Sequence, residues 1–190
     1  MAVVSVVGVI LGAGASRRLG RSKQALPLGD TTLLGWVVRE AEASLLDRIV
    51  VITRGDIHTG RAVVARPEAR DTTCSASLKA GLAAVGACDA VMLLLGDTPE
   101  VDASVIDGVR AAWESTRPWA LVTQYEGGLG HPLAFAADAL PSLRTLRGEK
   151  AVWKLLESEA ERVEQAPIER PLPRDVDTWD DYELLVRTFA

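Results

Sequence analysis

The feature that most constrains the fold is an apolar stretch near the start of the chain, residues 3–11, which reads VVSVVGVIL. Val and Ile predominate, and polar residues do not alternate with them. This pattern is typical of a strand that is buried on both faces, as in a parallel sheet covered by helices. The stretch stops at a loop that contains Gly12 and Gly14. It therefore favours an α/β fold over an all-β or all-helical one.

The rest of the chain alternates between short apolar stretches and segments of helical periodicity. Strands are predicted at residues 47–53, 62–66, 90–95, 119–124, 132–136 and 162–166. Helices are predicted at 31–43, 75–85, 102–114, 139–146, 149–158 and 178–189, and Thr178 is placed to cap the last one. Residues 126–130 and 167–175 are expected to be loops. The alternation predicts an α/β three-layer sandwich with a mostly parallel sheet, as a single domain over residues 1–190.

Composition excludes several classes of function. The chain has 190 residues, with 26 acidic against 21 basic side chains and a net charge of −5, which argues against a general nucleic-acid-binding surface. Its apolar stretches are too short to cross a bilayer, and no cation precedes the first one as in a signal peptide, so we expect a cytoplasmic protein without a membrane partner. Cys74 and Cys88 show no zinc-site spacing with the two histidines, and reduced thiols are favoured over a disulfide.

The loop after the first predicted strand concentrates positive charge on this mildly acidic chain. Four cations follow Gly14 within nine residues: Arg17, Arg18, Arg21 and Lys23. Glycines that allow positive φ, exposed backbone amides and cations together make a phosphate site. The dinucleotide fingerprint GxGxxG is not met, because Arg17 stands at its third glycine, and the Walker pattern is also absent. A solvated turn with a cationic surface is the alternative interpretation.

A second unusual strand end lies at residues 96–99, Gly-Asp-Thr-Pro. Asp97 follows a run of apolar residues, and a buried carboxylate needs a partner. Magnesium bound to nucleotide phosphates would be such a partner, since Mg²⁺ takes carboxylate oxygens and keeps several waters. A helix N-cap before Pro99 is the alternative. Ligands of parallel α/β folds bind beyond the carboxyl ends of the strands, so the two loops would meet if their strands are adjacent.

Several motifs in the same order resemble one family. Residues 11–28, LGAGASRRLGRSKQALPL, are similar to the signature L-A-[AG]-G-x-S-x-R-[MFL]-G-x-x-K-x-L-L-P of the MobA-like nucleotidyltransferases. CSASLKAG, LLGDTPEV, GHPLAF, GEKAVWKLL and DVDTWDD resemble later motifs of its molybdenum cofactor cytidylyltransferase (MocA-like) branch. The chain departs from the pattern at Gly12, at residues 66–67, and at Glu149 and Lys150.

The resemblance implies a Rossmann-like (GT-A-like) nucleotidyltransferase fold and roles for particular residues. Arg18 and Lys23 align with the cations that bind the triphosphate, and Arg17 and Arg21 are weaker candidates. The nucleotide would be bound by Leu11, Gly12, Ala13, Gly14 and Ser77. Ser75 and Ser77 could instead cap their helix.

The metal and acceptor sites are also implied by the resemblance. Asp97 and Asp177 would bind Mg²⁺, with Asp175 as the alternative second ligand. His131 would contact the acceptor. Trp153 and Trp179 lie on helical patterns and are expected in the core or at a partner surface.

The implied reaction moves a nucleoside monophosphate from an NTP to a phosphorylated acceptor and releases pyrophosphate. Ala13 matches the cytidine-using branch, which favours CTP and a molybdopterin-type acceptor, and the family implies a molybdoenzyme client. The alternatives are another acceptor, such as a sugar phosphate or phospholactate, and a non-catalytic nucleotide- or cofactor-binding protein. A dinucleotide oxidoreductase is disfavoured by the missing third glycine.

Overall fold

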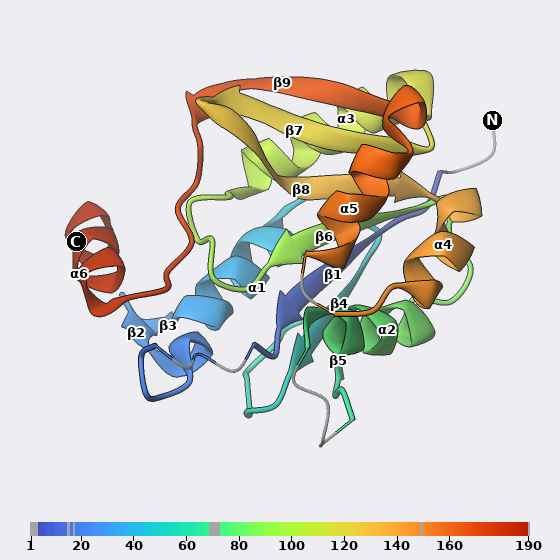
Figure 1. The fold of residues 1–190 in the computed structure, drawn as a ribbon. Helices are drawn as coiled ribbons and strands as arrows, with labels where there is room; N and C mark the ends of the chain where they lie inside the picture. The colour runs from blue at the N-terminus through green and yellow to red at the C-terminus, as the bar shows by residue number, and fades with distance from the viewer. Residues whose placement is uncertain (1–3, 15, 17, 69–72, 149, 190) are drawn as a thin grey trace.

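A seven-stranded sheet forms the centre of the protein (Figure 1). The computed structural model describes residues 4–14, 16, 18–68, 73–148 and 150–189. The strand order is β5 (Val63–Ala65), β4 (Arg48–Thr53), β1 (Val6–Gly12), β6 (Ala90–Leu95), β8 (Gly128–Ala136), β7 (Ala120–Glu126) and β9 (Val163–Pro171). Only β8 runs antiparallel to its neighbours among these strands. The predicted mostly parallel sheet is confirmed.

Helices cover both faces of the sheet and make the three layers (Figure 1). On one face lie α1 (Leu33–Ala43) and α3 (Ala103–Thr116), whose buried side chains share one core cluster. On the other lie α2 (Cys74–Ala84), α4 (Leu140–Thr145) and α5 (Ala151–Ser158) around a second cluster. The three-layer α/β sandwich follows from these two cores.

Strand β1 shows why the first apolar stretch lacks alternation. Val6 and Ile10 face the cluster beneath α1 and α3, whereas Val7 and Val9 face the cluster beneath α2. All four are at most 1% exposed. A strand between two cores needs apolar side chains on both faces, as the sequence pattern predicted.

Helix starts are set by short polar side chains. Thr32 accepts a hydrogen bond from the Gly35 amide, and Thr178 forms a reciprocal capping box with Asp181 at the start of α6 (Trp179–Thr188). The cap expected at Thr178 is confirmed. At α2 the cap is Thr73, not Ser75 or Ser77, because the helix begins at residue 74, one residue before the predicted start.

Two segments expected to be loops are partly strand. Residues 126–130 form the tight turn of the β7–β8 hairpin, with Gly127 at φ 100°, and β8 already begins at Gly128. Strand β9 continues through Pro167 to Pro171. Prolines are tolerated there because β9 is at the sheet edge, where one side of the backbone has no partner strand.

Short connections complete the described chain. The 3-10 helices η1 (Lys23–Ala25), η2 (Ala137–Ala139) and η3 (Ala160–Arg162) join longer elements, and β2 (Pro27–Leu28) pairs with β3 (Thr31–Thr32). Helix α6 packs on β2 and α1 in a third, smaller apolar cluster. Neither Cys74 nor Cys88 is in a disulfide, as the sequence favoured. In the described part of the chain, no helix has the length and apolarity needed to span a membrane.

Candidate active site

The loops after β1 and β6 lie side by side. The two strands are parallel neighbours, with Leu11 opposite Leu95, so their carboxyl ends meet at one edge of the sheet. The Gly96 amide donates a 3.0 Å hydrogen bond to the Leu11 carbonyl. The two strands are therefore adjacent, and the two loops meet as expected for that case.

Small residues allow this close approach. A Cβ built on Gly12 would lie 2.8 Å from Cδ1 of Leu34, and one built on Gly96 would lie 2.9 Å from Cα of Gly12. Neither Gly12 nor Gly14 has a positive φ. The expectation that these glycines provide positive φ is thus wrong, and close packing explains Gly12 instead.

The loop after β1 is folded around two polar side chains. The Ser16 hydroxyl accepts a 2.9 Å hydrogen bond from the Lys23 amide and donates to Oε1 of Gln24 at 3.3 Å. Ser22 donates to the same Gln24 oxygen at 2.9 Å. These bonds fold the loop back so that Lys23 returns to the sheet edge. No role was predicted for Ser16 or Gln24 from the sequence, although Ser16 is a fixed serine of the resembled signature.

Lys23 joins carboxylates from two distant parts of the chain. Its Nζ is ion-paired with Oδ2 of Asp97 and lies 3.0 Å from Oδ1 of Asp177. The Lys23 and Asp97 side chains are only 12% and 13% exposed. Burial opposes the charge on Lys23, but the Asp97 and Asp177 carboxylates outweigh it, so the pKa of Lys23 is raised. Asp97 is not a helix cap, because Asp102 caps α3.

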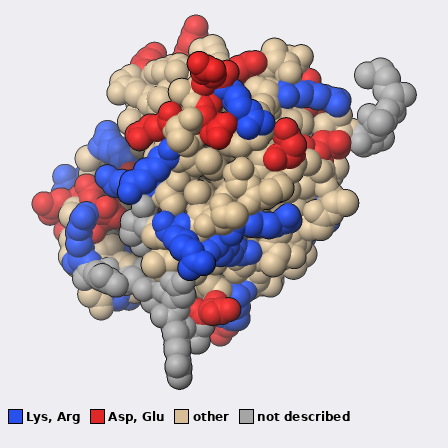
Figure 2. All heavy atoms as spheres, turned by 45° about the vertical axis from the view of Figure 1, so that its right-hand side comes forward, with Lys and Arg blue, Asp and Glu red and all other residues tan. Residues whose placement is uncertain are grey.

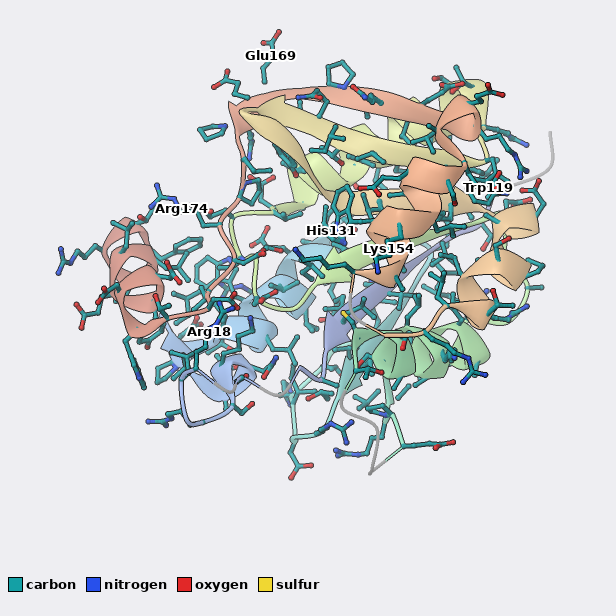
Figure 3. The ribbon with its side chains drawn as sticks, viewed as in Figure 1. Arg18, Trp119, His131, Lys154, Glu169 and Arg174 are labelled. Atoms are coloured by element: carbon teal, nitrogen blue, oxygen red, sulfur yellow. The ribbon has the colours of Figure 1, made fainter. Side chains whose placement is uncertain are left out.

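Asp177 connects the C-terminal segment to the loop after β1. Its Oδ2 accepts a hydrogen bond from Nη1 of Arg18 at 2.9 Å. Both side chains are open to solvent, with 72% of Arg18 and 49% of Asp177 exposed. Figure 3 shows Arg18 between this loop and α6. Arg18, Lys23, Asp97 and Asp177 therefore form one charged cluster.

A third carboxylate, Asp175, lies close to this cluster. Burial raises the pKa of Asp175, and the negative charges of Asp97, Asp177 and Asp181 raise it further against the opposing effect of Lys23. In the described part of the chain, no group of three or more His, Cys, Asp or Glu side chains could hold a metal by itself. The two carboxylates Asp97 and Asp177 nevertheless have the chemistry of Mg²⁺ ligands, since Mg²⁺ can take its other ligands from water and phosphate oxygens.

A cavity of about 570 Å³ opens beside the loop after β1. Its lining includes Gly12, Ala13 and Gly14 of the loop, and Arg21. It also includes Thr53, the last residue of β4, and Arg54 directly after it, and no role was predicted for either from the sequence. The candidate nucleotide-binding glycines and Arg21 thus share one cavity. Figure 2 shows basic and acidic side chains interspersed on one face of the molecule.

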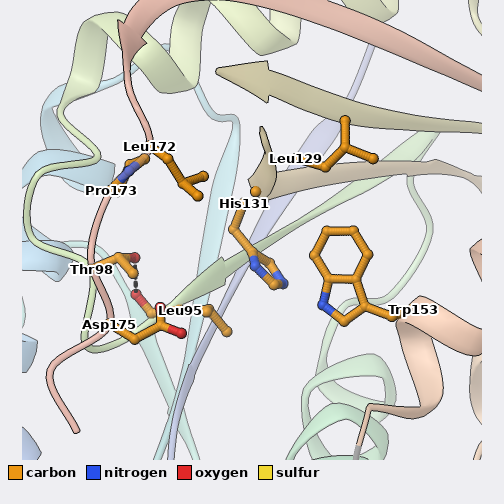
Figure 4. Close-up of a pocket in the computed structure, with 9 residues that line it drawn as sticks. Leu95, Thr98, Leu129, His131, Trp153, Leu172, Pro173 and Asp175 are labelled. Carbon is orange, nitrogen blue, oxygen red and sulfur yellow. Dashed lines mark hydrogen bonds between the residues drawn. The ribbon is translucent and has the colours of Figure 1, made fainter. Parts of the chain in front are cut away.

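Two smaller cavities lie on the α5 side of the cluster, with volumes of about 160 and 250 Å³. Both are lined by Leu95, His131, Trp153 and Asp175 (Figure 4). Burial lowers the pKa of His131 to about 4, so its imidazole is neutral at pH 7. Trp153 was expected in the core or at a partner surface. It packs, partly buried, against the second core cluster and also forms a wall of these cavities.

The other described residues singled out from the sequence lie outside the charged cluster. Leu11 lines the larger of these two cavities together with Ser75, whose Oγ accepts a 3.0 Å hydrogen bond from the Gly148 amide. Ser77 is buried in α2, 4% exposed. Trp179, expected in the core or at a partner surface, is 43% exposed on α6. Arg17 and Glu149 lie outside the described residues.

The family model for the MobA-like NTP transferase domain matches residues 8–164. The chain belongs to the MobA-like NTP transferase family. Purine catabolism protein PucB of Bacillus subtilis is 25% identical, over 97% of this chain and 98% of that protein. The Rv0371c homologue from Mycobacterium sp. strain JC1 has a TM-score of 0.88 and 36% identity, over 97% of this chain and 96% of that chain.

Another similar structure contains a metal. The Mycobacterium tuberculosis H37Rv protein Rv0371c, solved as a complex with manganese, has a TM-score of 0.83 and 32% identity, over 97% of this chain and 100% of that chain. The match to the MobA-like NTP transferase family identifies the protein as a nucleotidyltransferase with a Rossmann-like fold. The family and fold that the sequence motifs indicated are confirmed.

Proposed function

We propose that this protein transfers CMP from CTP to the terminal phosphate of a molybdopterin-type acceptor and releases pyrophosphate. An acceptor phosphate oxygen would attack the α-phosphorus, and the bond from that phosphorus to the bridging oxygen of the β-phosphate would break. The observation that carries the proposal is the charged cluster, in which Lys23 joins Asp97 and Asp177 beside the glycine-lined cavity. Positioning and charge neutralisation are what such a transfer requires.

Each side chain has a separate task in this proposal. Lys23 and Arg18 neutralise the charge that develops on pyrophosphate as it leaves. Asp97 and Asp177 would hold Mg²⁺, which supplies Lewis-acid polarisation of the phosphates when bound. The manganese in the Mycobacterium tuberculosis relative supports a divalent ion in this family. The choice of CTP rests on Ala13, which matches the cytidine-using branch.

The test is pyrophosphate release by the full chain with Mg²⁺ and molybdenum cofactor, with CTP, GTP, ATP and UTP compared. We expect the fastest release with CTP. Asp97→Asn should lower the rate by about 10²–10³-fold or more, because one preorganised charge is lost where the phosphates react. Asp138→Asn is the matched control. Asp138 lies in η2, directly after β8 and away from the charged cluster, and its side chain is 70% exposed.

The other outcomes discriminate between the alternatives. Undiminished release by Asp97→Asn would remove the metal role of Asp97, and faster release with GTP would overturn the choice of base. Pyrophosphate release only with a sugar phosphate or phospholactate would show that this compound, and not a molybdopterin-type molecule, is the acceptor. Binding of cofactor and nucleotide without any release would show a non-catalytic protein.

A further inference from the structure

The segment between β9 and α6, residues 172–178, brings Asp177 to the charged cluster, and Figure 1 shows it running from the end of β9 to α6. The backbone is anchored on both sides of Asp177. Val176 is 1% exposed and packs with Leu185 of α6 in the third apolar cluster. Thr178 is the N-cap of α6. Asp177 therefore lies between an apolar anchor and a helix start, while its own side chain stays half exposed.

One carboxylate connects the start of α6 to the backbone of Asp177. Oδ2 of Asp181 accepts hydrogen bonds from the Thr178 amide at 2.8 Å and from the Thr178 hydroxyl at 2.7 Å, within the capping box. The same oxygen accepts a third hydrogen bond, at 3.2 Å, from the amide of Asp177. A capping box involves only the N-cap and the third helical residue, so this bond is an addition to it. Asp181 is thereby joined directly to the backbone of the proposed metal ligand.

This bond leaves the Asp177 carboxylate available to a metal ion, because it uses the amide. The carboxylate oxygens themselves accept hydrogen bonds from Nζ of Lys23 at 3.0 Å and from Nη1 of Arg18 at 2.9 Å. In the proposed reaction both cations turn to the nucleotide phosphates, and their hold on Asp177 is lost. The bond from the Asp177 amide to Asp181 does not depend on the cations, so it remains when the metal binds.

We propose that Asp181 is a positioning residue, which fixes the backbone of Asp177 so that its carboxylate is already in place for the metal ion. This inference rests on the proposed function, because it concerns the metal ligand Asp177. It goes further by assigning a role to a side chain that acts through Asp177 and not by contact with the metal. A ligand that is oriented beforehand binds a metal more tightly than one that must be ordered on binding.

The experiment measures binding of Mn²⁺ alone to the full chain, without nucleotide, from the electron paramagnetic resonance signal of the free ion. Asp181→Ala should weaken Mn²⁺ binding by roughly 10- to 100-fold, the range for loss of a partner that orients a metal ligand. Asp181→Glu should retain most of the affinity, because Glu at the third helical position also forms a capping box. The matched control is Asp180→Ala. Asp180 is an exposed acid in the same first turn, so its loss removes the same charge and should leave Mn²⁺ binding unchanged.

Two further measurements separate positioning from a general loss of structure. In the Asp177→Asn background, Asp181→Ala should change Mn²⁺ affinity no further, because the ligand that it positions is already lost. In turnover assays, Asp181→Ala should raise KM for Mg²⁺, and saturating Mg²⁺ should restore most of the wild-type kcat. A merely structural role of Asp181 would instead lower kcat at every Mg²⁺ concentration, and that result would overturn the inference.

Failure of this inference differs from failure of the proposed function. Wild-type Mn²⁺ affinity in Asp181→Ala, together with weaker binding by Asp177→Asn, would overturn the positioning role and leave the proposed function intact. Equal weakening by Asp181→Ala and Asp180→Ala would also overturn it, because charge alone would explain both. Weaker Mn²⁺ binding by Asp181→Ala in a protein that releases no pyrophosphate would support positioning and remove the proposed reaction. Unchanged Mn²⁺ affinity in Asp177→Asn would overturn both the metal role of Asp177 and its positioning.

Discussion

At the scale of single residues, Lys23 is paired with two carboxylates and almost shielded from solvent. These carboxylates also suit a metal ion. The phosphates of a bound nucleotide would compete with Asp97 and Asp177 for the ammonium of Lys23. Both carboxylates would then be free to bind a metal ion. Nucleotide binding and metal binding are therefore expected to favour each other. The nucleotide draws Lys23 away from the carboxylates, and the metal draws the carboxylates away from Lys23.

Replacement of Lys23 tests this competition. Lys23→Met should lower kcat/KM for CTP by about 10²–10³-fold, because a preorganised positive charge is lost. It should also tighten binding of Mn²⁺ in the absence of nucleotide, because Asp97 and Asp177 lose their cationic partner. Free Mn²⁺ would be followed by electron paramagnetic resonance, with the exposed Lys154→Met on α5 as the control. Unchanged Mn²⁺ affinity would contradict the competition.

His131 makes stability depend on pH. Burial lowers its pKa in the folded protein to about 4, whereas the unfolded value is near 6.5. Between these values the unfolded chain binds more protons, so stability rises with pH and is lost as pH falls from about 6.5 toward 4. From pH 7 to 4.5, the wild type should lose about 2–3 kcal/mol more than His131→Asn. Urea unfolding at both pH values measures this difference, and equal losses in the two proteins would exclude it.

At the scale of elements, the site depends on how closely β1, β6 and α1 approach. A side chain on Gly96 would collide with the backbone of Gly12 as well as with Leu34. Backbone cannot yield as a flexible side chain does, so the loop after β6 would have to move. That movement would shift Asp97, the next residue, away from Lys23.

Gly96→Ala should therefore affect stability and turnover together. We expect a loss of about 1–3 kcal/mol in the free energy of unfolding, typical of overpacking, and slower pyrophosphate release. Gly55→Ala is the control for stability, because no heavy atom lies within 4 Å of its added Cβ. Its unfolding free energy should change by less than about 0.5 kcal/mol. Equal stability of the two variants would show that β1 and the loop accommodate a methyl group.

At the scale of the whole molecule, the site is assembled from parts that are far apart in the sequence. Lys23 comes from the loop after β1, Asp97 from the end of β6 and Asp177 from the segment before α6. A ligand that contacts all three joins the sheet to the C-terminal segment. Binding should consequently stabilise the molecule against global unfolding.

Thermal unfolding measures this linkage. CTP with Mg²⁺ at about 100 times Kd adds about 2.7 kcal/mol, which corresponds to a rise in Tm of about 5–10 °C for a chain of this size. The shift with both ligands should exceed the sum of the shifts with each alone. Asp97→Asn should lose this excess, and Asp138→Asn should keep it. A shift no larger than the sum would argue against coupled binding.

Periodicity, glycines and caps predicted the type of most elements and the position of the cationic loop after β1 from the sequence, because they act between residues close in the chain. The sequence also singled out Arg18, Lys23, Asp97 and Asp177 through the order of the motifs. Three features became visible only in the folded chain: Lys23 lies between Asp97 and Asp177, β8 is antiparallel, and Trp153 faces His131. Contacts between segments this far apart depend on which surfaces pack against the sheet, and local patterns do not encode that choice.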